Sequence, residues 1–450
     1  MKPAGITCRH RVTKAEEFLN GLSDYEKTTG YSYNAAYFNL KRMKYLLSLM
    51  ENPHLKVRSI HVTGTKGKGS TSNYIASILT ASGLKTGLYT SPHILTFRER
   101  IRVNNKMISK EELDRLTSKL EPLVAKIAKE TKFGLPTFFE VYTAMGFLYF
   151  YEKKVDVMVL EVGMGGRLDA TNVIAPLVSV ITPVSLDHMK ELGTTVSKIA
   201  GEKAGIIKPG MPVVSAPQDN SALTVIKKRA KSLKAVLKLS GRDFKHTVKS
   251  SGSSGVKFDL KGLGLGFKGL TSRMPGAHQA LNASVAVAAV ELAAGPLGLS
   301  GSLIKKVVSG AIRKTVLPGR VQLLSKRPFI LADAAHNAAS AGVLLDSLKT
   351  YKYKKLIMVI GMSANKDIKG FLRAFEKEAD LAIFVRSSNY RSADPAELYA
   401  LSGIQNNRVF EDVPSGLAYA LKTAGKGDMI CIAGSFYVLS DAFRHLRKQV

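Results

Sequence analysis

The residues best suited to chemistry form one short run, Gly64-Thr65-Lys66-Gly67-Lys68-Gly69-Ser70, between a predicted strand and a predicted helix. Glycine lets backbone N–H groups approach phosphate oxygens closely, and the start of a helix adds positive partial charge there. Lys68 can neutralise the charge of the β- and γ-phosphates. The standard Walker pattern has four residues between its first glycine and its Gly-Lys pair, whereas only Thr65 and Lys66 separate Gly64 from Gly67 here. The run predicts a nucleotide site built on a shortened phosphate loop.

A carboxylate and a histidine follow two of the other predicted strands. Glu161 closes the apolar run 155–162, which predicts a strand buried on both faces. Such strand ends present ligand-binding groups in α/β sheets, and ATP chemistry needs Mg²⁺ held by hard oxygen ligands. Glu161 is therefore a candidate for function rather than for a structural ion pair. A lone histidine is more often a surface or capping residue, but His188 follows strand 177–182 at a corresponding sheet end.

Alternating strands and helices position these residues. Apolar periodicity predicts opening helices over 13–22 and 34–51. The predicted strands that follow cover 58–63, 85–89, 155–162, 177–182 and 211–215, and the predicted helices cover 69–82, 109–131 and 137–152. A further helix carries a dense cationic run, Lys227, Lys228, Arg229, Lys231, Lys234 and Lys238. This βαβ order predicts an α/β fold with a mainly parallel sheet covered by helices.

The order then changes, and a second α/β series begins. Residues 240–269 are rich in glycine and serine and predict hairpins at the edge of the sheet, before helices over 277–294 and 301–313. Leu317-Pro318-Gly319 has the composition of a hinge. Beyond it the predicted strands cover 329–332, 355–360, 381–386 and 428–433, and the predicted helices cover 338–350, 368–378, 413–424 and 435–448. We expect a large P-loop domain over 1–315 and a smaller Rossmann-like α/β domain over 316–450.

Composition narrows the class of protein. The chain has 450 residues, enough for two or three domains. It carries 66 Lys and Arg against 35 Asp and Glu, a formal charge of +31. Because these cations are spread along the chain, without a basic tail or an aromatic-interleaved patch, we expect a basic surface that attracts anionic small molecules rather than nucleic acid.

The sequence also indicates a cytoplasmic protein with no membrane partner. Its N-terminus lacks the apolar core of a secretory signal. The longest apolar stretch, 280–299, is too interrupted to cross a bilayer unaided and predicts a buried helix. The two cysteines, Cys8 and Cys431, lack metal spacing and fit a reducing compartment.

The shortened loop resembles that of the Mur ligase superfamily, and further motifs narrow the resemblance to folylpolyglutamate synthase/dihydrofolate synthase. They run in order along nearly the whole chain. The motifs are Ser91-Pro92-His93, Phe97–Ile101, Phe138–Glu140, Leu160–Asn172, Asp187-His188, Glu202–Lys208, His278-Gln279, Asn282, Leu317–Arg320 and Asp333–Asn337. One position departs from the family: Asn365 stands where an acidic residue usually precedes the pair Lys366-Asp367.

The resemblance implies a set of metal and phosphate ligands. Ser91 and Glu161 would hold one Mg²⁺, and Glu161 with His188 a second. Lys203 would be carbamylated by CO₂, because an unmodified lysine beside two Mg²⁺ ions would add repulsion. The alternative for Lys203 is an ordinary helix lysine near Glu202.

The resemblance also implies ATP contacts across the hinge. Asn282 and Asp333 would bond the nucleoside, and Arg320 would clamp the phosphoryl charge when the small domain closes. His336, close to Asp333, would contact the acyl phosphate or the glutamate. The two domains would then correspond to the ATP-binding and glutamate-ligase domains of the family.

The implied reaction is an ATP-dependent ligation. A carboxylate of dihydropteroate or a folate attacks the γ-phosphate, and the amine of L-glutamate then displaces phosphate from the acyl phosphate. Ser91-Pro92-His93 looks like the forms that also use dihydropteroate, so both activities are expected, from a monomer.

Two other functions remain open at this point. A peptidoglycan ligase of the Mur type would share the chemistry, but its front domain needs about a hundred residues before the loop, and only 63 precede Gly64. A basic P-loop NTPase that acts on nucleic acid would instead show salt-sensitive binding to nucleic acid and no glutamate-dependent release of ADP.

Overall fold

The computed structural model describes residues 13–24, 34 and 38–447, so the N-terminal residues that include Cys8 lie outside the described part. An eight-stranded sheet, in the order β4-β3-β2-β5-β1-β6-β7-β8, forms the centre of the large domain. Six of its strands are parallel: β1 (Arg58–Thr63), β2 (Thr86–Tyr89), β5 (Val157–Glu161), β6 (Val178–Ile181), β7 (Val213–Ser215) and β8 (Leu237–Leu239). β3 (Ile101–Val103) and β4 (Lys106–Met107) extend one edge in antiparallel pairing. The parallel sheet predicted from the sequence is therefore confirmed.

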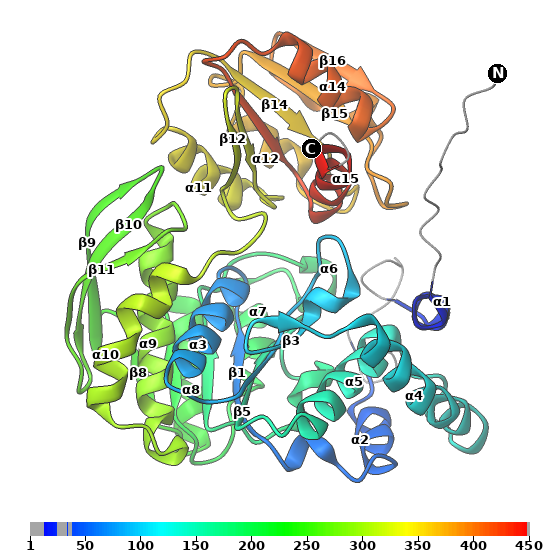
Figure 1. The fold of residues 1–450 in the computed structure, drawn as a ribbon, viewed down its shortest axis with the longest axis vertical. Helices are drawn as coiled ribbons and strands as arrows, with labels where there is room; N and C mark the ends of the chain where they lie inside the picture. The colour runs from blue at the N-terminus through cyan, green and yellow to red at the C-terminus, as the bar shows by residue number, and fades with distance from the viewer. Residues whose placement is uncertain (1–12, 25–33, 35–37, 448–450) are drawn as a thin grey trace.

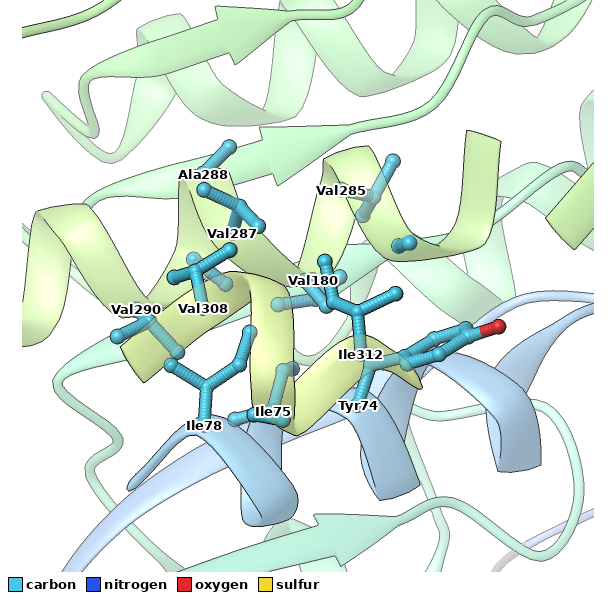
Figure 2. Close-up of a cluster of buried hydrophobic side chains, with 14 of the residues drawn as sticks. Tyr74, Ile75, Ile78, Val180, Val285, Val287, Ala288, Val290, Val308 and Ile312 are labelled. Atoms are coloured by element: carbon cyan, nitrogen blue, oxygen red, sulfur yellow. The ribbon is translucent and has the colours of Figure 1, made fainter. Parts of the chain in front are cut away.

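Helices bury both faces of this sheet. One face packs on α3 (Lys68–Ala81), α9 (His278–Leu297) and α10 (Gly301–Lys314), and Figure 2 shows their side chains meeting Val180 of β6. The other face packs on α1 (Lys14–Gly21), α2 (Leu40–Ser48), α4 (Lys110–Glu130) and α5 (Phe138–Glu152). Within β5, Val157 and Val159 face the first layer while Met158 and Leu160 face the second. This alternation explains why the strand reads as a continuous apolar run.

Of the remaining helices of the large domain, the last two bury side chains against β6 and β7, and the others have only three or four residues. In chain order, the remaining helices are η1 (Pro53–Leu55), η2 (Phe97–Arg100), η3 (Ala170–Val173), α6 (Met189–Leu192), α7 (Val196–Ala204) and α8 (Asn220–Ser232). The last of these is shorter than predicted: Lys234 lies beyond its end and Lys238 lies in β8. The cationic run is thus not one helix face.

The long apolar helix behaves as the sequence predicted. Of the described helices, α9 alone is long and apolar enough to cross a membrane by length and composition, but 72% of its apolar window is buried inside the protein. It packs between α3 and the sheet on one side and β9 and β10 on the other. The helix is therefore a core element of this domain.

The glycine- and serine-rich segment corrects one prediction. Its strands β9 (Phe244–Gly252), β10 (Gly255–Gly262) and β11 (Phe267–Ser272) do not extend the main sheet but form a separate three-stranded antiparallel sheet. Phe258 and Leu270 are buried with α9 and α10, so this small sheet covers those helices from outside (Figure 1). The hairpins were predicted correctly, but the prediction that they lie at the edge of the main sheet was wrong.

A second sheet, of six strands in the order β12-β13-β17-β14-β15-β16, forms the small domain. Four predicted strands are confirmed, and β12 (Gln322–Lys326) and β16 (Asn407–Phe410) are additional. The confirmed strands are β13 (Phe329–Ala332), β14 (Leu356–Ile360), β15 (Leu381–Val385) and β17 (Met429–Ala433). The helices are α11 (Ala338–Leu348), α12 (Ile368–Arg373), the unpredicted α13 (Pro395–Leu401), α14 (Val413–Thr423) and α15 (Phe436–Arg447).

The eight-stranded and six-stranded sheets lie in two separate domains, which a single chain segment connects. Figure 1 shows the small domain stacked above the large one, with the segment between α10 and β12 running between them. Every strand of the six-stranded sheet comes after residue 321 and every strand of the other sheets before residue 273. A division near residue 315 stays a prediction that fits this arrangement.

Candidate active site

The phosphate loop begins where β1 ends, with the ends of two neighbouring strands beside it. Val62 of β1 pairs with Glu161 of β5, and Thr63 pairs with Ile181 of β6. The loop itself uses glycines where a side chain would not fit. A Cβ atom on Gly64, at φ +148°, would lie 1.9 Å from Thr182 Oγ1. One on Gly67, at φ +82°, would lie 2.3 Å from Asn282 Oδ1. The loop is thus packed closely between β6 and α9.

Hydrogen bonds fix the middle of the loop to the segment after β6. The backbone N–H groups of Thr65 and Lys66 both donate to Pro183 O, at 2.9 and 3.3 Å. The Thr65 hydroxyl donates to Ser185 O at 3.1 Å. Burial lowers the pKa of Lys66 below its usual value, and the charge of Asp187 partly opposes this. Ser70 is buried in the first turn of α3. The loop is therefore held in shape by its own neighbours.

Two lysines converge on one carbonyl of this loop. Lys68 Nζ donates to Gly64 O at 3.1 Å, and Lys203 Nζ, from α7, donates to the same oxygen at 2.8 Å. Lys203 is 4% exposed, and its burial and the charge of Lys68 lower its pKa to about 7. Its surroundings therefore favour the neutral amine more than those of an exposed lysine do.

Glu161 is a buried carboxylate with few protein partners. The Ser91 backbone N–H donates to its Oε2 at 3.3 Å, the one hydrogen bond that Glu161 accepts from the described residues. Burial raises its pKa, against the charges of Lys68 and Arg320. Both carboxylate oxygens face Gly69, 3.6 Å from where its Cβ would lie. A desolvated, under-bonded carboxylate beside a phosphate loop has the donor chemistry that Mg²⁺ requires.

Most of the remaining metal ligands would be substrate phosphates and water. Within residues 13–24, 34 and 38–447, no group of three or more histidine, cysteine, aspartate or glutamate side chains is arranged to hold a metal ion. Mg²⁺ usually binds through one or two carboxylates together with substrate phosphates and water. Ser91 and Glu161 fit that pattern, since they are adjacent and lie next to the loop.

His188 lies at the start of α6 in a left-handed conformation, with φ +48°. Its Nδ1 atom is 3.9 Å from Glu191 Oε2, and its side chain remains 41% exposed. Lost hydration within the site and the positive charge of Lys366 keep its pKa below the usual value, although Asp187 opposes the shift. This shift favours the neutral imidazole, the form in which histidine can bind a metal ion.

Asp187, the residue before His188, contacts two residues of the small domain. Asp187 Oδ1 accepts a hydrogen bond from Lys366 Nζ at 3.1 Å, and Asp187 Oδ2 lies 4.0 Å from His336 Nε2. Lys366 and His336 both belong to the small domain. Burial alone would raise the pKa of Asp187, but the nearby His336 side chain and the charge of Lys366 hold it below its usual value.

The small domain contributes two more predicted residues at the end of β13. Asp333 accepts hydrogen bonds from the backbone N–H groups of Val321, at 2.7 Å, and Ala335, at 2.8 Å. Burial raises its pKa, and the charge of Arg320 opposes this. The Arg320 guanidinium lies over the Phe436 ring, 5.0 Å from its centre, and its charge also acts on Glu161. Arg320 thus spans the gap between Asp333 and the large domain.

Two adjoining cavities lie between the domains. One, of about 230 Å³, is lined by Phe139, His188, His336, Lys366 and Arg391 among others. The other, of about 700 Å³, reaches Gly69, Glu161 and Arg320. Ser91 lines both. The carboxyl ends of both sheets therefore face a shared space, as expected for ligand sites in open α/β sheets.

Known families match both domains of this chain. The Mur ligase middle domain matches residues 62–290, and the Mur ligase glutamate ligase domain matches residues 319–436. A dihydrofolate synthase/folylpolyglutamate synthase of Bacillus subtilis is 34% identical over 414 residues, which cover 91% of this chain and 95% of that protein. The chain belongs to the Mur ligase family.

Within that family, its relatives are folylpolyglutamate and dihydrofolate synthases. A folylpolyglutamate synthase of Lacticaseibacillus casei is 32% identical over 93% of this chain and 97% of that protein. The structure of Mycobacterium tuberculosis folylpolyglutamate synthase complexed with ADP is 31% identical, with a TM-score of 0.86 and coverage of 96% and 97%. This Mur ligase is an ATP-dependent ligase, and the comparisons support that function over the peptidoglycan and nucleic-acid alternatives.

The structure brings together most of the candidates that the sequence named. The loop residues, Lys203, Glu161 and Ser91 form one cluster, and Asp187 links His188 and His336. Asn282 touches the loop from α9, where its Nδ2 donates to Gln279 Oε1 at 3.2 Å.

Sequence reasoning missed three groups. Asp187 was noted only as the neighbour of His188, Lys366 only as part of a departing motif, and Arg391 not at all. The signal for Arg391 was weak, because it lies in a loop after β15 with no motif around it.

Proposed function

We propose that this Mur ligase joins L-glutamate to dihydropteroate or to a folate, with cleavage of ATP to ADP and phosphate. The names of its relatives support this substrate class, because they include both dihydrofolate synthases and folylpolyglutamate synthases. The single observation that carries the proposal is the meeting of the phosphate loop and Glu161 with Arg320 and His336 around adjoining cavities.

ATP would lie with its phosphates on the Gly64–Ser70 loop and its nucleoside between Asn282 and Asp333. Lys68 neutralises the β- and γ-phosphates from one side and Arg320 from the other. Ser91, Glu161 and His188 would hold two Mg²⁺ ions, which supply charge neutralisation for the transferring phosphoryl group when bound. Glu161 suits this task since it is already desolvated and short of hydrogen bonds.

The acid substrate would occupy the cavity beside Phe139. That cavity combines an aromatic wall, formed by Phe38, Phe139, Phe436 and Tyr437, with polar groups near its ends. A flat pterin ring can stack on such a wall. Its carboxylate would then extend past Ser91, which also lines the neighbouring cavity, toward the phosphate loop.

Lys203 would carry a carbamate in the active enzyme. The neutral amine attacks CO₂ through its lone pair, an N–C bond forms, and one proton is released to solvent. This step needs an unprotonated amine, and the buried Lys203, with its pKa of about 7, provides one. The product is an anion beside Lys68 and the loop, where a cationic lysine would oppose metal binding.

The reaction would proceed in two displacements. A carboxylate oxygen of the acid attacks the γ-phosphorus, the bond to the β-phosphate oxygen breaks, and ADP leaves. The amine of L-glutamate then attacks the acyl carbon, phosphate leaves with the C–O bonding electrons, and the amine gives up a proton. His336 would contact the glutamate or the acyl phosphate. The protein acts chiefly by positioning the groups and by neutralising charge.

The domain interface would protect the acyl phosphate from water. Asp187 and Lys366 already connect the domains at the edge of the cavity. We further propose a cytoplasmic monomer that needs no nucleic acid and no membrane, in which the charge of +31 draws anionic substrates to the surface.

Release of ADP tests the proposal directly. The purified protein is assayed with dihydropteroate, tetrahydrofolate or a UDP-muramyl peptide, each with and without L-glutamate. Glutamate-dependent release with either of the first two supports the proposal and ranks the two activities. Release that depends only on the peptide, or on nucleic acid, would contradict it.

A further inference from the structure

Arg391 differs from every other charged side chain that lines the smaller cavity. Lys366 is paired with Asp187, and Glu140 is paired with Arg42 at 2.9 Å. Asp169 accepts hydrogen bonds from the backbone N–H groups of Met164 and Thr171 and from the Thr171 hydroxyl, and Glu191 faces His188. Arg391 forms no ion pair within the part of the chain that the structure describes. Among the described residues that line this cavity, Arg391 is thus the cation without a carboxylate partner.

The guanidinium of Arg391 is held in place by one hydrogen bond, but not all of its N–H donors have a hydrogen-bond acceptor. Its Nη2 donates to the Tyr437 hydroxyl at 3.1 Å, and its Nε is buried with no hydrogen-bond partner among the described residues. A buried donor without a partner is costly, and a guanidinium has the fork geometry that matches a carboxylate. The site is therefore short of one carboxylate-like acceptor.

The backbone around Arg391 is fixed to the small-domain sheet. Its carbonyl accepts a hydrogen bond from Ala364 N at 2.9 Å, two residues before Lys366. Ala393 N donates to Met362 O at 2.8 Å. These bonds tie the loop after β15 to the end of β14, so the guanidinium is presented from a rigid base rather than from a free loop.

We propose that Arg391, oriented by Tyr437, binds a carboxylate of the incoming L-glutamate. The inference rests on the proposed function and names one residue that selects the amino acid. L-Glutamate carries two carboxylates beyond its attacking amine. Because that amine must reach the acyl phosphate near the loop, a carboxylate extends away from the loop, toward the small domain. Arg391 and His336 both line the cavity from that domain.

The acid substrate is a poorer match for Arg391. Its reacting carboxylate must meet the γ-phosphate, and the charges that act on Glu161 beside the loop are those of Lys68, Arg320 and Arg102. Arg391 instead shares its cavity wall with Ser363 and Ser435, at the carboxyl ends of β14 and β17. Bound glutamate would neutralise Arg391 while leaving the contact between Lys366 and Asp187 in place.

Steady-state kinetics of Arg391→Gln and Arg391→Lys test this role, with L-glutamate, ATP and the acid substrate each varied in turn. Loss of a charge-assisted hydrogen bond predicts a KM for L-glutamate about 10- to 100-fold higher in Arg391→Gln. The KM values for ATP and for the acid should change less than about threefold. Arg391→Lys should recover part of the loss, and Tyr437→Phe should cost only a few-fold.

Arg386→Gln is the matched control, because Arg386 lies five residues earlier, is exposed, and pairs with Asp394 outside this cavity. It should keep the parent KM for L-glutamate, and thermal melts should match for all variants. An unchanged KM for L-glutamate in Arg391→Gln would overturn the inference, as would a rise confined to the KM for the acid. The proposed function would fail separately, if the parent protein showed no glutamate-dependent release of ADP.

Discussion

The two halves of the active site are built in different ways. The half in the large domain is centred on consecutive residues, Gly64–Ser70, which are fixed by hydrogen bonds to Pro183 and Ser185. The half in the small domain is assembled from the ends of separate strands, with His336 after β13, Lys366 after β14 and Arg391 after β15. The shape of a contiguous loop can be fixed by the few residues that surround it. Residues that follow separate strands are positioned relative to one another only by the sheet that those strands form.

This difference also separates the tasks of the two halves. In the proposed function, the loop, Lys203 and Glu161 would surround the transferring phosphate, so changes there should affect chemistry more than binding. The small-domain groups face the cavity from the opposite side and contact the large domain through Asp187. Changes there should affect substrate affinity and domain closure. Each of the predictions below would break or sharpen this contrast.

The largest effect is expected for Lys68→Ala. Lys68 donates to Gly64 O and its charge acts on Glu161 and Lys203, so its removal leaves the phosphate charge uncompensated. We expect kcat to fall at least about a thousandfold, with a melting temperature near that of the parent. Retention of most activity would remove the phosphate-loop assignment.

Lys203→Ala should be nearly inactive as well, but for a reversible reason. If the carbamate supplies the missing anion, formate or acetate should restore part of the activity. Lys203→Arg should not work, because guanidinium stays cationic and cannot take up CO₂.

The parent enzyme should also respond to pH and CO₂. Below the Lys203 pKa of about 7 the ammonium form dominates, so activity should fall as pH drops through this range in CO₂-stripped buffer. A fully active Lys203→Arg, with no response to CO₂, would return Lys203 to an ordinary helix lysine.

Glu161→Gln should lose activity but keep its stability, whereas Glu140→Gln should lose stability but keep most of its activity. Glu161→Gln should lose Mg²⁺-dependent activity by about a hundredfold or more and keep its stability. Glu140 instead caps α5 and pairs with Arg42, with both side chains nearly buried. Breaking that pair should cost about 3 kcal/mol of unfolding free energy and little activity in the folded fraction. Equal activity losses, unrelieved by excess Mg²⁺, would mean that Glu161 is not the metal carboxylate.

Local signals made much of the fold predictable. Continuous apolar runs placed β5 and β6, and glycine with lysine between a strand and a helix placed the loop. The errors have physical causes. The strands β12 and β16 are short edge strands with exposed polar residues, so they lack a clear apolar pattern. The separate sheet of β9, β10 and β11 has ordinary alternation, and only tertiary packing on α9 decides its place.

The candidate site was predictable where neighbouring residues in the sequence are also neighbours in space. Asp187 and Lys366 are 179 positions apart, and their contact depends on how the two domains meet. Arg391 stands out as a candidate for binding a carboxylate only because the other charged side chains around it are paired. Such compensation is a property of the assembled cavity, and no single segment encodes it.

The smallest effect should come from the pair that connects the halves. Asp187 and Lys366 are 16% and 18% exposed, so their attraction is only partly screened. A double-mutant cycle of Asp187→Asn and Lys366→Met should give a coupling of about 1 kcal/mol in unfolding free energy. The same cycle for Arg386 and Asp394, which are 51% and 57% exposed within the small domain, should give a value near zero. Equal coupling energies for the two pairs would show that the contact between Asp187 and Lys366 stabilises the closed arrangement of the domains no more than an exposed surface pair would. The small-domain half would then be positioned by its own sheet alone, without support from Asp187.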